Sequence, residues 1–192
     1  MSDQEALKLA SVLIGYPEND VWHALDEALD AARHIENESV SEHLIQAIAG
    51  MREMGYEALK HHYVNVFDFS ESTCLYLTAH EYGDNRARGN AFINLRILLA
   101  SEGFEQLGEE LPDYLPLLFE FLAVCDNEEK TNPVKERLAK CVARILDHLD
   151  VDSPYQLVFT AIAELLPAPG DQQFPDREEA DQGEMPYPLP FG

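Results

Sequence analysis

Residues 131–149 read TNPVKERLAKCVARILDHL, and they carry the clearest helical pattern in the chain. Apolar side chains recur every three or four residues, at Val134, Leu138, Cys141, Val142, Ile145 and Leu149. This spacing places them on one face of an α-helix. Thr131 or Asn132 can cap the helix, and Pro133 suits its first position, where a missing N–H costs nothing. We therefore predict an amphipathic helix that packs this face against others, with Cys141 as a small buried apolar residue.

The same spacing recurs on both sides of that helix. Further helices are predicted over residues 4–14, 17–32, 40–55, 59–67, 84–103 (with Asp84 as the cap), from Pro112 onward, and 153–165. A strand signal is visible only at residues 75–78, where the neighbouring sequence is helical. The sequence thus predicts an all-α fold, a single-domain bundle of about eight or nine helices.

The composition changes after Leu166. Residues 167–170 read PAPG and end the last helix, and the remainder is rich in proline and acidic residues. Such a segment buries too little apolar surface to offset its ordering entropy. We predict a helical domain over residues 1–166 and a flexible tail over 167–192. The apolar residues near Gly192 are also compatible with a polyproline-like segment that docks on a groove of this protein or of a neighbour.

The chain has 192 residues with 36 acidic and 13 basic side chains, a net charge of -23. This charge repels nucleic acid and anionic membranes, and it attracts basic peptides. Acidity also keeps a protein in solution, and that alternative stays open. The start of the chain lacks the features of a signal peptide, and no apolar run is long enough to cross a bilayer. We expect a cytoplasmic protein with three reduced cysteines and no direct membrane insertion.

Motifs of catalysis are absent from the sequence. There is no phosphate-binding loop, no GxGxxG, no GxSxG and no HExxH. His61 and His62 are adjacent, so on a helix they point about 100 degrees apart, and we interpret them as exposed side chains rather than metal ligands. Acidic pairs such as Glu109 and Glu110 are expected by chance in this composition. We predict no catalytic residue, no metal site and no cofactor.

Two polar segments interrupt the helical pattern. Residues 80–89 read HEYGDNRARG, and residues 110–116 read ELPDYLP. In the first, arginines beside carboxylates are typical of a clamp between two helices, or of the polar rim of a binding groove. In the second, Pro112 and Asp113 suit the first turn of a helix. The same carboxylate, beside the aromatic ring of Tyr114, also suits an arginine or lysine of a partner.

These segments resemble the NarJ branch of the TorD/DmsD/NarJ family of redox-enzyme maturation chaperones. The resemblance covers residues 5 to about 166 and rests on YVNVFD at 63–68, LYLTAHEYGD at 75–84, RARG at 86–89 and ELPDYLP at 110–116, with LIGYP at 13–17 and SPY at 153–155 in support. The family often has histidine at the position of Tyr114, so the tyrosine favours an aromatic contact over an imidazole role.

The resemblance implies an all-helical chaperone without enzymatic activity or a stable cofactor. Such a chaperone binds the N-terminal segment of a molybdoenzyme catalytic subunit of the nitrate reductase type. It holds this client for insertion of the molybdenum cofactor and iron–sulfur clusters, before membrane attachment or export. Cofactor-delivery proteins are further expected partners, nucleic acid is not, and we expect a monomer or a weak dimer.

We predict a peptide-binding groove between the helices that follow Tyr56, Asp84 and Pro112. An amphipathic basic helix would lay its apolar side in this groove and its charges against the rim. The residues predicted to form the site are Phe67, Asp68, His80, Tyr82, Asp84, Arg88, Asp113, Tyr114 and Leu115.

Three alternatives to this function remain open on the sequence alone. The first stays within the family: a chaperone whose client is a dimethyl sulfoxide or selenate reductase-type enzyme. Outside it, the chain is a nucleotide-binding or hydrolytic enzyme, or a helical scaffold that joins stable partners permanently.

Overall fold

The computed structural model describes residues 1–104, 110–170 and 174. Within these residues the chain forms ten α-helices and one π-helical turn. The helices are α1 (Asp3–Leu13), α2 (Asn19–His23), α3 (Leu25–Ala32), α4 (Glu38–Met54), α5 (Tyr56–Tyr63), η1 (Val64–Asp68, the π-helical turn), α6 (Leu77–Tyr82), α7 (Ala87–Ser101), α8 (Leu115–Val124), α9 (Glu128–His148) and α10 (Pro154–Leu165). The all-α prediction is confirmed, and no strand occurs in the described part of the chain.

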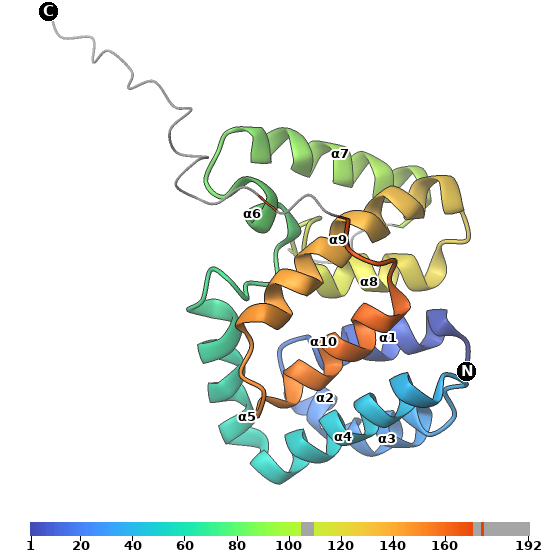
Figure 1. The fold of residues 1–192 in the computed structure, drawn as a ribbon, viewed down its shortest axis with the longest axis vertical. Coiled ribbons are helices and arrows are strands. Elements are labelled where there is room, and N and C mark those ends of the chain that lie inside the picture. The colour runs from blue at the N-terminus through green and yellow to red at the C-terminus, as the bar shows by residue number, and fades with distance from the viewer. Residues whose placement is uncertain (105–109, 171–173, 175–192) are drawn as a thin grey trace, which may run out of the picture.

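The core of the bundle surrounds α10, which lies between α4 and α9 and also packs on α1 (Figure 1). Tyr155 and Phe159 on α10 are fully buried, as are Phe119 and Phe121 on α8. Each large apolar side chain of this kind stabilises the fold by about 1.5–3 kcal/mol when it leaves water. Cys141 is also fully buried, as its apolar stripe predicted. In contrast, α7 lies at one end of the molecule and packs chiefly on α6.

The starts of α9 and α7 differ from the sequence predictions. Helix α9 begins at Glu128, so Pro133 is its sixth residue rather than its first. The acidic first turn of Glu128 and Glu129 suits the helix dipole, and Thr131 is buried, so the helix gains a turn upstream of the predicted cap. Helix α7 begins at Ala87, whose N–H donates to the side chain of Asn85 at 2.8 Å. Asn85 therefore does the capping predicted for Asp84, which is exposed.

The sequence predicted about eight or nine helices, whereas the described residues contain ten α-helices, for two reasons. The apolar stripe of residues 17–32 divides at Ala24 into α2 and α3, and residues 77–82 form a short helix of their own. The stripe of residues 59–67 also changes geometry after Tyr63, where a π-helical turn begins. This wider turn directs Phe67 inward against Tyr155, with the ring centroids 4.9 Å apart.

The segment before α8 is a turn rather than a helix, closed by a hydrogen bond from the Tyr114 N–H to the Leu111 carbonyl at 3.0 Å. Helix α8 begins at Leu115, with Pro116 at its second position, so Pro112 lies outside the helix and the predicted start is wrong. A short antiparallel bridge pairs Tyr76 with Tyr114. The Leu77 N–H donates to the Asp113 carbonyl, and the Leu115 N–H donates to the Leu75 carbonyl, both at 2.9 Å. The bridge is confined to Tyr76, and residues 77 and 78 already belong to α6.

Candidate functional site

The two polar segments singled out in the sequence meet in the structure. The bridge between Tyr76 and Tyr114 holds residues 110–115 against the start of α6, and α6 packs on α7, which carries Arg88. Side chains that are separated by about 25 to 35 residues in the sequence therefore share one small region of the surface and the layer just beneath it.

Asp113 lies in that layer and is completely buried. One oxygen of its carboxylate accepts a hydrogen bond from the Thr78 N–H at 3.2 Å and another from the Thr78 hydroxyl. The Arg88 Nε donates to the same hydroxyl at 3.0 Å, and its Nη2 lies 3.8 Å from Asp113 Oδ2. Burial raises the pKa of Asp113, while the bonds from Thr78 and the charge of Arg88 oppose the rise. The network ties α6, α7 and the start of α8 together.

This burial changes the interpretation of Asp113. The sequence predicted a carboxylate in the first turn of a helix, available to a partner, but Asp113 precedes Leu115 by two residues and faces the interior. Its short side chain turns inward, where Oδ2 accepts from Thr78 and lies 3.8 Å from Arg88, while the buried Oδ1 has no hydrogen-bond partner in the described part of the chain. Asp113 therefore positions its neighbour Tyr114 rather than reaching the surface itself.

Tyr114 belongs to a chain of aromatic rings that reaches the surface. The aromatic patch consists of Tyr16, Tyr63, Tyr76 and Tyr114. The Tyr76 and Tyr114 rings lie 5.5 Å apart, the hydroxyls of Tyr63 and Tyr114 lie 3.3 Å apart, and Tyr16 packs edge-on against Tyr63 at 5.2 Å. Tyr63 is buried beneath the other rings, whereas Tyr16 is exposed and Tyr76 and Tyr114 are half-buried. Four separate chain segments thus build one aromatic surface.

Carboxylates lie beside the aromatic patch. Burial raises the pKa of Tyr76, and the charges of Glu110 and Asp68 add to the rise. Burial likewise raises the pKa of Tyr114 to about 12, again with contributions from Glu110 and Asp68. Asp68 and Glu110 are both exposed. An aromatic face with negative charge at its edge is suited to an arginine or lysine side chain.

Each of these carboxylates is followed in the sequence by an exposed apolar residue. Phe69, next to Asp68, is 80% exposed, and Leu111, next to Glu110, is 44% exposed. Neither residue was predicted to belong to the site, and neither were Tyr16, Tyr76 and Glu110. The signal for the two tyrosines was present, because each lies inside a family-like stretch, LIGYP or LYLTAHEYGD. Tyr76 reaches Tyr114 through the bridge, and Tyr16 reaches Tyr63 of α5 through packing, and periodicity reveals neither contact.

The structure divides the nine predicted site residues into three groups. The buried residues are Phe67, His80, Asp113 and Leu115. The half-buried residues are Tyr82, Arg88 and Tyr114, and the exposed residues are Asp68 and Asp84. Arg88 and Asp113 meet, and Tyr114 lies beside Asp68. Asp84 makes no hydrogen bond or ion pair with any residue in the described ranges.

Two parts of the predicted groove are therefore corrected. Phe67 and Leu115 were expected to offer apolar contact to a peptide, but both belong to the core, because the π-helical turn and the start of α8 direct them inward. The three helices expected to enclose the groove do not surround one space, since α5 and α7 lie at opposite ends of the molecule (Figure 1).

His80 and Glu81 connect α6 to neighbouring parts of the bundle through hydrogen bonds and an ion pair. The buried His80 Nε2 donates to the Cys74 carbonyl at 2.7 Å, and burial lowers its pKa to about 4. Glu81 forms a two-bonded ion pair with Arg137 of α9, at 2.6 and 2.7 Å. These contacts link α6 to the bundle and do not reach the aromatic patch.

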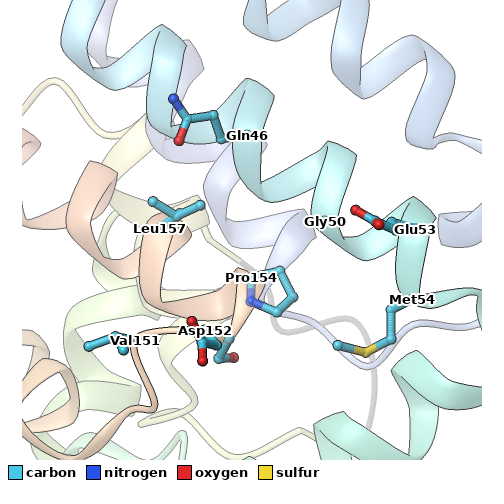
Figure 2. A pocket seen from close by; sticks show the side chains of 9 residues that line it. Gln46, Gly50, Glu53, Met54, Val151, Asp152, Pro154 and Leu157 are labelled. Atoms are coloured by element: carbon cyan, nitrogen blue, oxygen red, sulfur yellow. The ribbon is translucent and has the colours of Figure 1, made fainter.

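A separate groove lies between α4 and the start of α10 (Figure 2). Its volume is about 340 Å³, and it is lined by Gln46, Gly50, Glu53, Met54, Val151, Asp152, Ser153, Pro154 and Leu157. Val151 at its edge is 80% exposed. The groove combines apolar side chains with two carboxylates, and the sequence analysis did not single it out.

The histidines of α5 differ from one another. His61 is exposed as predicted, but His62 is half-buried: its Nε2 lies 2.8 Å from the Ser153 hydroxyl and its ring stacks on Tyr155. The helical turn directs His62 toward α10, which periodicity alone did not show. Among the described residues, no three His, Cys, Asp or Glu side chains are arranged to hold a metal ion. Every helix in those residues is too short or too polar to cross a membrane.

The model of the nitrate reductase delta subunit family matches residues 21–159, which is most of the chain. The chain belongs to this family. The match confirms the resemblance to NarJ-type redox-enzyme maturation chaperones that the sequence motifs indicated.

Two relatives illustrate the match. The "probable nitrate reductase molybdenum cofactor assembly chaperone NarJ" of Bacillus subtilis is 35% identical over 119 residues, which cover 62% of this chain and 64% of that protein. The "nitrate reductase molybdenum cofactor assembly chaperone NarJ" of Escherichia coli K12 is 27% identical over 165 residues, covering 83% of this chain and 68% of that protein. The chain thus spans about two thirds of the length of these relatives.

A solved structure shares the fold. A candidate redox enzyme maturation protein from Archaeoglobus fulgidus superposes with a TM-score of 0.64 at 22% identity, covering 84% of this chain and 91% of that one. This likeness confirms the helical architecture.

Proposed function

We propose that this chain is a chaperone for the assembly of a molybdoenzyme of the nitrate reductase type. It binds the N-terminal segment of the catalytic subunit and holds that subunit while molybdenum cofactor and iron–sulfur clusters are inserted. Family membership supports this proposal, together with the names of the Bacillus and Escherichia relatives. The chain acts in the cytoplasm, before the client is attached to the membrane or exported, and it turns over no substrate.

The aromatic patch and its two carboxylates carry the proposal. A basic, partly apolar peptide would place an arginine or lysine over Tyr76 or Tyr114, with Asp68 and Glu110 neutralising its charge. Phe69 and Leu111 would contact its apolar side chains. Tyrosines are favourable at such a surface because they offer a large contact area and lose little rotamer entropy.

The predicted site residues take different roles in this proposal. Tyr114 and Asp68 contact the peptide. Asp113 and Arg88 position Tyr114 from the interior, since they fix the turn before α8. Phe67 and Leu115 belong to the hydrophobic core on which the residues of the patch pack.

Calorimetry with a peptide of the client's N-terminal segment tests the site. We expect Tyr114→Ala to weaken binding by at least about tenfold, which corresponds to about 1.4 kcal/mol. Tyr114→Phe keeps the aromatic face and should stay within about threefold of the wild type. Asp68→Asn with Glu110→Gln should also weaken binding, because these substitutions remove charge without changing shape.

Variants of the second groove serve as the matched control. Val151→Ser and Glu53→Gln change exposed residues at the groove of Figure 2, far from the bridge, and should leave the affinity unchanged. Wild-type affinity for Tyr114→Ala, in a protein with an unchanged circular dichroism spectrum, would refute the assignment to the aromatic patch. A loss of affinity in the control variants alone would move the site to the second groove.

A further inference from the structure

The outer face of α7 is apolar and exposed in the part of the chain that the structure describes. Ile93 and Ile97 are 58% and 62% exposed, and they lie one helical turn apart. Helical spacing places Gly89 and Ala100 on the same face, where both are exposed, and a Cβ at Gly89 would meet no atom within 4 Å. Two isoleucines thus stand at the centre of a low ridge, and the small residues at its ends leave room for another backbone to approach.

The isoleucines are not what attaches α7 to the bundle. The opposite face of the helix buries Ala91, Leu95 and Leu99, and α7 packs chiefly on α6 at one end of the molecule (Figure 1). A surface helix of a soluble protein normally has one apolar stripe, which faces the core. A second, exposed stripe is typical of a contact surface for another polypeptide.

The charge of α7 is opposite to that of the chain as a whole. Residues 85–101 contain three arginines and no acidic residue, although 36 of the 192 residues are acidic. Arg88 lies on the inner side, where it meets Asp113. The exposed Arg96 lies at the edge of the isoleucine stripe and makes no ion pair with any residue within the described ranges. A positive side chain therefore flanks the apolar face and is available to a partner.

Charge decides which occupant fits this face. The net charge of -23 repels nucleic acid and anionic membranes, which leaves a protein partner. The basic segment proposed for the client is attracted to Asp68 and Glu110 at the aromatic patch and is repelled by Arg96. A second copy of this chain fits poorly, because two molecules of charge -23 repel each other. Antiparallel packing of two α7 helices through their isoleucines would also bring each Arg96 close to its counterpart.

We infer that the outer face of α7 binds an acidic amphipathic helix of another protein. A ridge of side chains spaced four residues apart, such as Gly89, Ile93 and Ile97, fits the groove of a second helix. Aliphatic side chains of the partner cover the two isoleucines, and a carboxylate beside them pairs with Arg96. The client segment proposed above is basic and binds at a different surface, so either proposal can fail without the other.

Nuclear magnetic resonance on the full chain tests this contact with a synthetic probe. The probe is a helix of about 18 residues, with leucine at every third or fourth position and glutamate and alanine elsewhere. The titration uses about 150 mM NaCl, where the Debye length of about 8 Å screens distant acidic residues of the protein. We expect shifts of the amide resonances of residues 89–101 with a Kd of about 1 mM or tighter, and no shifts at Tyr76 and Tyr114.

Variants of the α7 face should weaken this binding. Ile93→Ser with Ile97→Ser removes the apolar contact, and Arg96→Glu reverses the flanking charge, so each should raise the Kd at least about tenfold. All three positions are exposed, and an unchanged circular dichroism spectrum checks the fold. The same loss is expected for two altered probes: one with lysine in place of each glutamate, and one with its leucines scattered around the helix.

Matched variants separate this contact from general effects. Val12→Ser with Val124→Ser removes two exposed apolar side chains elsewhere, and Arg33→Glu reverses an exposed charge elsewhere, so both should leave the Kd unchanged. Absence of α7 shifts at 1 mM probe, or equal affinity for either altered probe, would overturn the inference. So would dimerisation that the Ile93→Ser and Ile97→Ser variant abolishes in sedimentation experiments, since a second copy would then occupy the face.

Discussion

Asp113 and Tyr114 are neighbours in the chain, yet one is completely buried and the other helps to form the surface. A turn before α8 produces this difference, because the Tyr114 N–H donates to the Leu111 carbonyl and so places Asp113 within the turn, while Tyr114 leaves it in an extended conformation and pairs with Tyr76. Asp113 turns inward to Thr78 and Arg88, and Tyr114 turns toward Tyr63 and Tyr76. One residue thus anchors the segment while the next presents an aromatic ring.

His80 gives a prediction about pH. Burial lowers its pKa from 6.5 to about 4, and its Nδ1 has no partner among the described residues, so a second proton would find no acceptor. A lowered pKa in the folded state means that this group's contribution to stability is present above pH 6.5 and is lost as the pH falls toward 4. We expect the free energy of unfolding to lose about 3 kcal/mol from His80 over this range.

Urea denaturation at several pH values measures this loss. His80→Gln keeps a donor for the Cys74 carbonyl but does not titrate, so the difference in stability between wild type and variant should shrink by about 3 kcal/mol between pH 7 and pH 4. His61→Gln changes an exposed histidine and should follow the wild-type profile. Parallel profiles for wild type and His80→Gln would contradict the prediction.

The turn between α6 and α7 depends on the backbone conformation of one glycine. Gly83 ends α6 at φ 55° and ψ -130°, a conformation that side chains rarely adopt. Gly83→Ala should therefore reduce the free energy of unfolding by about 1–3 kcal/mol. Gly89→Ala is the matched control on α7: a Cβ there meets no atom within 4 Å, and the helical backbone suits alanine.

Thermal or urea unfolding distinguishes the two glycines. The Gly89→Ala variant should be more stable than the wild type by up to about 1 kcal/mol, because alanine loses less backbone entropy in a helix. Equal effects at both positions would show that the Gly83 backbone relaxes at little cost, and that the turn between α6 and α7 is not fixed by this residue.

Helical elements could be predicted well from the sequence, while their ends could not. The apolar stripe of residues 134–149 identifies α9 because burial on one face repeats every 3.6 residues. Its start was misplaced, since the acidic first turn and buried Thr131 extend the helix beyond the expected proline position. The short bridge at Tyr76 was missed as well, because two hydrogen bonds between distant segments leave no periodic signal.

At the scale of the whole molecule, the fold class and the family could be predicted from the sequence, and the arrangement of the site could not. Composition and periodicity predicted an all-α bundle, and family-like motifs predicted the family. The groove was not predictable, because burial of Phe67 and Leu115 follows from packing among η1, α8 and α10 rather than from local pattern. Tyr16 contacts Tyr63, and Tyr76 contacts Tyr114, through tertiary packing of the same kind. The proposed aromatic patch is thus a tertiary feature, whose members the sequence shows only as separate tyrosines.

The net charge of -23 leads to a prediction about binding rates. A strongly acidic surface attracts a basic peptide over a distance set by the Debye length, about 30 Å at 10 mM salt and about 3 Å at 1 M. If the chain captures the client's N-terminal segment, its association rate should fall at least about tenfold between 20 and 500 mM NaCl, while the dissociation rate changes less. Stopped-flow fluorescence with a labelled peptide measures both rates. A control peptide with glutamine at each basic position should associate slowly and with little salt dependence, and equal salt dependence for the two peptides would contradict charge-guided capture.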